Sequence, residues 1–211
     1  QDLIAGYDKT TTGFVLKCWQ LSTGKQIFNK IIPLKGEEPK LLAARFFENQ
    51  KKVAVLGMRY LQVYNVADGM LLRSTDEVLL SLENDFVINH NATLITEVNS
   101  TGEMSFEDTM LTPRQTIQAH DGGINKLYYS VNDDLIYTAG GDNTIKIFRT
   151  ATGKLIGTLY IFKDSKDYVF IDPTGRFDGT PEGIKKLYYV KDRKVVTLDK
   201  IYEKFYTPNL Y

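Results

Sequence analysis

Short stretches rich in apolar residues, some of them with alternating polar residues, follow one another along most of the chain. The first two are residues 3–7 and 14–20, and further pairs occur at 41–47 and 52–56, 86–89 and 93–98, and 124–129 and 135–139. Alternation with a period of two places successive side chains on opposite faces of a strand, and short apolar runs of this length are also typical of strands. The chain also has 13 Tyr, 11 Phe and many β-branched residues, which favour strands. We therefore predict an all-β protein.

A second pattern recurs at longer range. Three stretches read apolar, polar, apolar, aromatic, and each has a glycine five positions after the aromatic residue; the pairs are Trp19 with Gly24, Tyr64 with Gly69, and Phe148 with Gly153. A glycine at this place suits a turn that needs a positive φ. The last two aromatic residues are 84 positions apart, twice 42, which predicts another copy centred on 106. Phe106 stands there, but its flanking residues fit the pattern poorly.

These observations predict units of roughly 42 residues with four antiparallel strands each, the last strand being a stretch such as residues 154–160. This is the repeat period of a β-propeller blade. We expect a β-propeller of about five four-stranded antiparallel blades and one short C-terminal helix. The first unit lacks its first strand. Either the C-terminal segment supplies that strand and the ring closes, or further N-terminal sequence completes a larger ring, which is the interpretation we favour.

The fourth unit resembles a WD40 repeat. Ala119-His120 stands where that family has Gly-His, and residues 133–148 (DDLIYTAGGDNTIKIF) are similar to the stretch L-A-S-G-S-x-D-x-T-x-K-I-W. The resemblance implies a chain of hydrogen bonds from Asp142 through His120 to Thr138. It also implies a Trp as the fourth member, but Phe148 occupies that position and has no N–H, so we expect the chain to stop at three.

A buried imidazole held between a carboxylate and a hydroxyl satisfies its own polar groups and fixes how strands meet. The same residue types, in His120, Thr138 and Asp142, also make up a catalytic triad. We interpret the three as a structural hydrogen-bond chain and expect no catalytic residues. The other histidine, His90, lies between two asparagines and is expected in a polar surface turn.

The last segment carries a different resemblance. Residues 167–183 (DYVFIDPTGRFDGTPEG) are similar to the signature D-W-V-x-x-x-P-D-G-x-Y-D-G-S-P-x-G of bacterial WD40-repeat proteins, in which it precedes a caspase-like peptidase domain. Residues 201–210 (IYEKFYTPNL) are similar to their connector F-x-x-x-F-Y-x-P-x-L. The resemblance implies a fragment cut just before its peptidase domain. We divide the chain into WD40-like blades at 1–163, the first incomplete, and an atypical terminal blade with a connector helix at 164–211.

Four apolar residues near the end of the chain recur at helical spacing: Leu198, Ile201, Tyr202 and Phe205. Their spacing of i, i+3, i+4 and i+7 predicts one amphipathic helix, which Pro208 ends. The helix either packs on the final blade or presents an apolar stripe to a partner. Pro173 and Pro181, in contrast, indicate plain turns.

Charge and composition argue against several classes of function. Lys and Arg total 26, as do Asp and Glu, so the net charge is zero. A nucleic-acid interface gathers an excess of basic residues on one face, so we expect no nucleic-acid partner.

No apolar run approaches the roughly 20 residues that span a bilayer, and we expect no membrane insertion. The single cysteine, Cys18, lies among apolar residues and is expected in the core. A reducing compartment fits it, which slightly favours the cytoplasm over the periplasm.

No residue pattern indicates a cofactor or a metal ion. One cysteine and two histidines supply no zinc pattern, and the glycines at 140–141 belong to a β-turn rather than to a phosphate-binding loop. Asp172, Asp178 and Glu182 are close in sequence but lack the ligand spacing of a calcium loop.

Three functions remain open. A non-catalytic scaffold that binds a protein partner, as the regulatory or targeting part of a larger protein with a caspase-like peptidase domain, fits the repeat and the zero net charge. An enzyme or small-ligand-binding domain that uses the central channel would need charged residues at equivalent positions of several blades. The innermost strands, 41–47 and 124–129, are mostly apolar, with Arg45, Asn125 and Lys126. A purely structural or oligomer-forming role is the third function, and we favour the scaffold.

Overall fold

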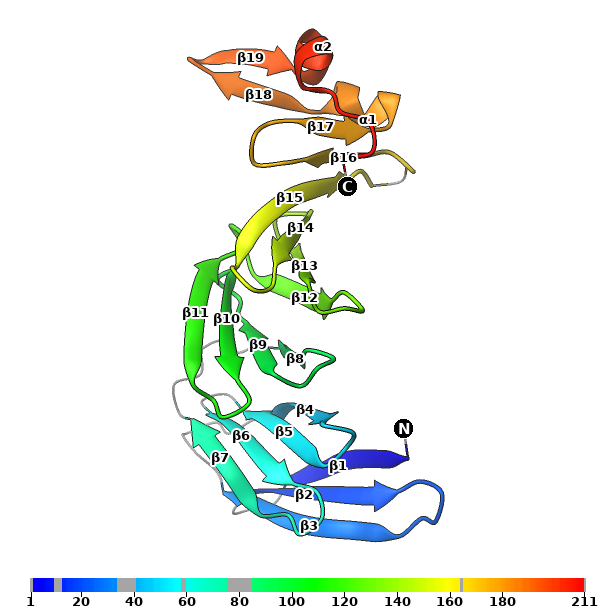
Figure 1. Ribbon diagram of the computed structural model, residues 1–211, viewed down its shortest axis with the longest axis vertical. Helices are drawn as coiled ribbons and strands as arrows, with labels where there is room; N and C mark the ends of the chain where they lie inside the picture. The colour runs from blue at the N-terminus through cyan, green and yellow to red at the C-terminus, as the bar shows by residue number, and fades with distance from the viewer. Residues whose placement is uncertain are drawn as a thin grey trace. The chain divides into compact units, whose positions relative to one another are not determined.

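The computed structural model describes residues 2–9, 13–33, 41–57, 60–75, 85–163 and 165–210 (Figure 1). Over these residues the chain forms antiparallel sheets with a few short helices near its C-terminus, which confirms the predicted all-β class. Backbone contacts divide it into two compact units, Gln1–Gln118 and Ala119–Tyr211. Residue 164, where the terminal segment was predicted to begin, lies outside the described residues.

The first unit contains three sheets of consecutive strands. Sheet A consists of β1 (Leu3–Lys9), β2 (Gly13–Gln20) and β3 (Gln26–Pro33). Sheet B consists of β4 (Leu41–Phe47), β5 (Lys52–Gly57), β6 (Tyr60–Asn65) and β7 (Leu71–Thr75). Sheet C consists of β8 (Asp85–Ile88), β9 (Leu94–Val98), β10 (Glu103–Asp108) and β11 (Pro113–Gln118). Every strand predicted in this unit is present and begins within one residue of its expected start.

The second unit is built on a six-stranded antiparallel sheet, sheet D. Its strands are β12 (Ile124–Tyr129), β13 (Leu135–Gly140), β14 (Thr144–Arg149), β15 (Lys154–Ile161), β16 (Tyr168–Ile171) and β17 (Phe177–Gly179). A separate hairpin consists of β18 (Tyr188–Lys191) and β19 (Lys194–Thr197). Strand β16 pairs with β15, so sheet D continues past the predicted division between 1–163 and 164–211. That division stays a prediction.

The aromatic residue of the sequence repeat marks the same irregularity in sheets A, B, C and D. The pairing register between the aromatic-bearing strand and the next strand shifts beside Trp19, Tyr64, Phe106 and Phe148. Five residues later the backbone is left-handed each time, with φ values of 66°, 66°, 62° and 62° at Gly24, Gly69, Leu111 and Gly153. The copy predicted at Phe106 is therefore present. Its sequence is atypical because Leu111 stands in the glycine position, at a cost of about 1–2 kcal/mol.

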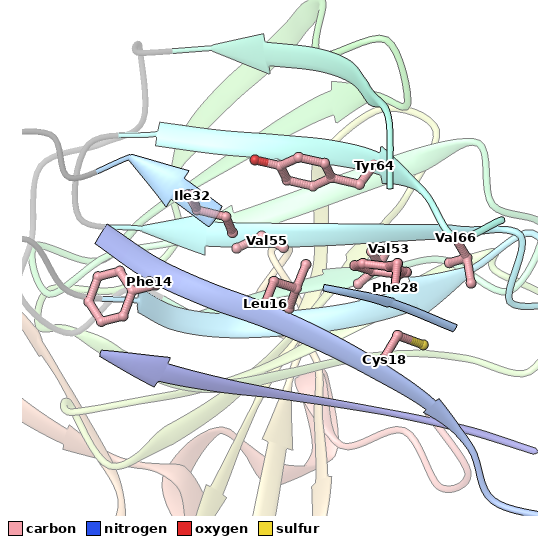
Figure 2. Packing of buried hydrophobic residues seen from close by; sticks show 9 residues of the cluster. All are labelled: Phe14, Leu16, Cys18, Phe28, Ile32, Val53, Val55, Tyr64 and Val66. Atoms are coloured by element: carbon pink, nitrogen blue, oxygen red, sulfur yellow. The ribbon is translucent and has the colours of Figure 1, made fainter. Parts of the chain in front are cut away.

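Sheet B is covered on both faces within the first unit. Alternate residues of β5 point in opposite directions: Val53 and Val55 join a buried cluster with sheet A, and Ala54 joins a cluster with sheet C. Figure 2 shows the first cluster, in which Leu16 and Cys18 of β2 gather with the two valines. Cys18 is fully buried, as predicted, and burial raises the pKa of its thiol. Consecutive sheets of this unit therefore pack face to face in chain order.

A helix occupies residues 181–186, where the sequence indicated a plain turn. Helix α1 (Pro181–Lys186) begins after Thr180, whose Oγ1 accepts a hydrogen bond from the Gly183 N–H at 3.2 Å. Proline suits the first helical position because a backbone N–H there has no acceptor within the helix, so its absence from proline costs no hydrogen bond. The prediction of a plain turn at Pro181 was wrong, because Thr180 caps a helix whose first residue is this proline.

The predicted C-terminal helix is present as two short pieces, η1 (Leu198–Ile201) and α2 (Tyr202–Phe205). Leu198, Ile201 and Phe205 pack into the core of the second unit. The remaining member of the predicted stripe, Tyr202, stacks on Tyr206 with 4.1 Å between ring centroids. The apolar stripe thus packs on its own unit. None of the helices in the described ranges has the length and hydrophobicity that a bilayer crossing needs.

A close approach between β15 and β16 depends on a glycine. A Cβ added at Gly157 would overlap the ring of Phe170, with its Cε1 at 2.8 Å, and Phe170 is itself buried. We expect Gly157→Ala to destabilise the second unit by about 1–3 kcal/mol. Urea denaturation of a double-mutant cycle with Phe170→Leu checks this. The two substitutions should compensate in part, and strictly additive losses would contradict the explanation.

Candidate functional site

The three residues predicted to form a hydrogen-bond chain meet in the second unit. Thr138 lies on β13, Asp142 in the turn that joins β13 to β14, and His120 in the segment that leads into β12. The His120 side chain and Thr138 are both fully buried, whereas the Asp142 side chain remains 18% exposed. The site therefore lies within the structure, with only the carboxylate in contact with solvent.

The imidazole of His120 is bound at both nitrogens. Its Nδ1 lies 2.9 Å and 3.0 Å from the two carboxylate oxygens of Asp142, and its Nε2 lies 2.8 Å from the Thr138 Oγ1. Because an ionised carboxylate only accepts hydrogen bonds, Nδ1 carries the proton. In the neutral ring Nε2 then accepts the hydroxyl proton of Thr138, which satisfies every polar atom of the ring.

Asp142 accepts more than the histidine bond. The Thr144 hydroxyl and backbone N–H donate to its Oδ1 at 2.7 Å and 3.1 Å, and the Asp121 N–H donates to Oδ2 at 3.4 Å. Partial burial by itself would raise the pKa of Asp142, but the hydrogen bonds from Thr144 and His120 outweigh it and lower the pKa to about 2. The carboxylate is therefore ionised at neutral pH.

Two further members of this site were not predicted. Thr144 is one of them, and the Asp-x-Thr spacing that is typical of such a turn was a local signal for it. The other is Lys146, whose Nζ donates to the Ala119 carbonyl at 2.8 Å and lies 3.8 Å from the Asp142 Oδ2. The WD40 stretch has a lysine at this position, but the partner of Lys146 is 27 residues away, so the contact itself could not be read from the local sequence. Phe148, at the position where the WD40 family has a Trp, is buried, and its side chain has no N–H that could extend the hydrogen-bond chain.

The order hydroxyl, imidazole, carboxylate is also that of a hydrolytic triad, in which the hydroxyl attacks a substrate carbonyl. Attack requires a hydroxyl that substrate can reach, and Thr138 has no exposed surface. What the arrangement does accomplish is mechanical. It ties the segment before β12 to β13 and to the following turn through charge-assisted hydrogen bonds, which are stronger than neutral ones.

We expect Asp142→Asn to destabilise the second unit by roughly 2 kcal/mol at pH 7, because it removes charge-assisted hydrogen bonds to His120 and Thr144. Since the folded-state pKa lies below the ordinary value of 3.8, the stabilisation is present above about pH 4 and is lost as the pH falls towards 2. The difference between variant and parent should therefore shrink in acid.

Urea denaturation at pH 7 and at about pH 2.5 measures this difference. Asp121→Asn is the matched control, because Asp121 is exposed and reaches the site only through its backbone N–H. A loss for Asp142→Asn that stays the same at both pH values would contradict the role given to the carboxylate charge.

The other acidic residues singled out in the sequence do not gather into one site. Asp172, Asp178 and Glu182 are each bound by a separate partner: respectively the Arg176 side chain, the Asn209 N–H and the Lys185 ammonium. Within the described ranges, no group of three or more His, Cys, Asp or Glu residues is placed to hold a metal ion. His90 is exposed, as predicted for a surface turn.

Comparisons with known proteins do not identify a family. No family model matches the chain, and no curated protein matches it significantly. Function is therefore inferred from the fold and from the geometry of these residues.

Proposed function

We propose that the chain is part of a WD40-type β-propeller that serves as a non-catalytic protein-interaction scaffold. The observation that carries this proposal is the device repeated in four successive sheets, a register shift at an aromatic residue followed five residues later by a left-handed turn residue. Four antiparallel strands every 40–45 residues is the blade period. The face-to-face packing of sheets A, B and C in chain order agrees with it.

The hydrogen-bond chain of His120, Thr138 and Asp142 supports the WD40 part of the proposal. The family resemblance implies these three partners, and the observed distances of 2.8–3.0 Å are those of full hydrogen bonds. The complete burial of the Thr138 hydroxyl supports the non-catalytic part. A scaffold needs rigid loops rather than reactive groups, and the hydrogen bonds among His120, Thr138 and Asp142 fix one loop of the fourth unit.

We propose further that the scaffold is the regulatory or targeting part of a larger bacterial protein with a caspase-like peptidase domain. The support is the signature at residues 167–183, in which Gly179 and Gly183 have a packing role. A Cβ added at Gly183 would lie 2.5 Å from the Tyr168 carbonyl oxygen, and one at Gly179 would overlap the same oxygen. The signature residues thus specify a compact end to sheet D.

Affinity enrichment from the source cells tests the scaffold. The parent chain and Gly141→Ala, a variant expected to fold, should both retain a protein that Gly140→Ala, a variant expected to be destabilised, does not. Isothermal titration calorimetry of the purified retained protein with the parent chain should then show saturable binding. A thermal-shift screen covers the competing function: a metabolite that raises the melting temperature to saturation, with no protein retained, would contradict the scaffold.

The coding sequence beyond Tyr211 tests the peptidase association. We expect it to encode a domain with a catalytic histidine followed by a catalytic cysteine. A stop codon directly after Tyr211 would remove this part of the proposal and leave the scaffold unaffected.

A further inference from the structure

The hairpin of β18 and β19 exposes an apolar face. Tyr188, Val190 and Val195 are 60%, 67% and 58% exposed. Val190 and Val195 are direct cross-strand partners, and Tyr188 is two residues from Val190, so the three side chains share one face. On the opposite face Tyr189 packs into the core of the second unit. A strand with one buried face ordinarily carries polar residues on the other, so a contiguous apolar patch here indicates a surface that another molecule covers.

The hairpin also has unpaired edges. It forms a two-stranded sheet by itself, and among the described residues no third strand pairs with either side. Its two-residue turn, Asp192-Arg193, has φ values of 52° and 60°, the left-handed geometry whose twist matches that of paired strands. The hairpin is thus a well-formed template whose outer N–H and C=O groups can accept another extended segment.

Charge narrows the choice of partner. The hairpin, residues 188–197, contains Lys191, Arg193 and Lys194 against the single acid Asp192. Arg193 and Lys194 are exposed at the tip, beside the apolar face. A complementary partner therefore carries carboxylates near the tip and apolar side chains over the three exposed residues.

We propose that this hairpin binds an acidic, extended segment of a partner protein, which adds as a third strand at a free edge and packs its own apolar side chains against the exposed Tyr188, Val190 and Val195. The inference rests on the proposed scaffold function and gives it a surface and a partner chemistry. A second copy of the chain would offer the same basic hairpin rather than the acidic residues that complement it. A lipid surface would match the charge, but it offers no strand to the unpaired backbone groups.

Selection of displayed random decapeptides on the immobilised chain tests the proposal. We expect the selected peptides to carry Val, Ile or Tyr at alternate positions and Asp or Glu at the end that lies beside the basic tip. Their affinity, measured by fluorescence anisotropy, should fall at least tenfold for Val190→Thr/Val195→Thr and for Arg193→Glu/Lys194→Glu. The threonine variant keeps β-branched residues in the strands, so the hairpin should still form. Val131→Thr is the matched control, since Val131 is 91% exposed but lies outside the hairpin.

Backbone hydrogen exchange locates the contact. Amides of residues 188–197 should exchange more slowly when a selected peptide is bound, because edge N–H groups become paired. Selected peptides that bind both hairpin variants as tightly as the parent would overturn this inference and leave the scaffold proposal intact. A library that yields no binder, or only basic ones, would overturn it too.

Two further outcomes would assign the hairpin a partner other than an acidic segment. Binding to vesicles of phosphatidylcholine and phosphatidylserine that disappears in Val190→Thr/Val195→Thr would show that the hairpin recognises a membrane surface. Dimers in sedimentation that dissociate in the same variant would show that a second copy covers it. Either result overturns the strand-addition proposal, whereas the enrichment experiment on source cells tests the scaffold separately.

Discussion

A Glu97→Gln variant should be more stable than the parent chain at pH 7, by on the order of 3 kcal/mol. Glu97 and Glu107 lie on the neighbouring strands β9 and β10, and their side chains are on the same face of sheet C. They are 1% and 5% exposed. The Glu97 Oε1 has no hydrogen-bond partner among the described residues. An ionised carboxylate at this place would be very costly, so the group holds its proton instead.

Burial first, and then the nearby Glu107 carboxylate, raise the pKa of Glu97 to about 8 from its ordinary value of 4.5. Because the folded-state value is the higher one, the folded protein binds a proton that the unfolded chain has released between these pH values. The contribution of Glu97 to stability is therefore fully present below about pH 4.5 and is lost as the pH rises towards 8, by about 1.4 kcal/mol per pH unit. Glutamine resembles the protonated form and removes this loss.

Unfolding in urea at pH 5, 7 and 8.5 provides the measurement, and the fluorescence of Trp19, the single tryptophan, reports on the first unit. Glu103→Gln is the matched control. It makes the same charge change in the same sheet, and the new amide oxygen can still accept the Asn99 hydrogen bond that Glu103 accepts at 2.8 Å. The advantage of Glu97→Gln should grow from pH 5 to pH 8.5. An advantage that does not change with pH would show that Glu97 is ionised in the folded protein.

A Gly140→Ala variant should lose about 3 kcal/mol of stability in the second unit, at the upper end of the cost of overpacking. An added Cβ would lie 2.5 Å from the His120 Cγ and 2.8 Å from the Asp142 Oδ1, and it would overlap the imidazole Nδ1. The imidazole is buried and bound at both nitrogens, so it cannot move aside without breaking one of these hydrogen bonds. The substitution therefore acts on the hydrogen-bond chain rather than on the turn.

The neighbouring glycine is the control. A Cβ at Gly141 would come no closer than 3.5 Å to another atom, the Gly123 carbonyl oxygen, which is an ordinary contact. Hydrogen exchange of the β13 and β14 amides should accelerate strongly in Gly140→Ala and little in Gly141→Ala. Equal protection in the two variants would contradict the tight packing of His120 against this glycine.

Much of the local structure could be read from single stretches of sequence. Short apolar runs, in part alternating with polar residues, predicted the strands, and the glycine positions predicted left-handed turns at 24, 69 and 153. The trio of His120, Thr138 and Asp142 came from a family pattern rather than from periodicity. Helix α1 was missed because one capping hydrogen bond, from Gly183 to Thr180, decides between a turn and a helix at Pro181.

The sequence by itself thus determined where the strands and turns lie, because a period of two and a positive φ are properties of a few consecutive residues. Only the tertiary structure decided which strand faces are covered. Glu97 follows the polar Thr96 in a short strand, and nothing in these neighbours indicates its burial, which depends on elements far from it in sequence. Lys146 enters the His120 site in the same way, through the distant Ala119 carbonyl. The energies of burial and of hydrogen bonding arise between distant segments, so they leave no local pattern.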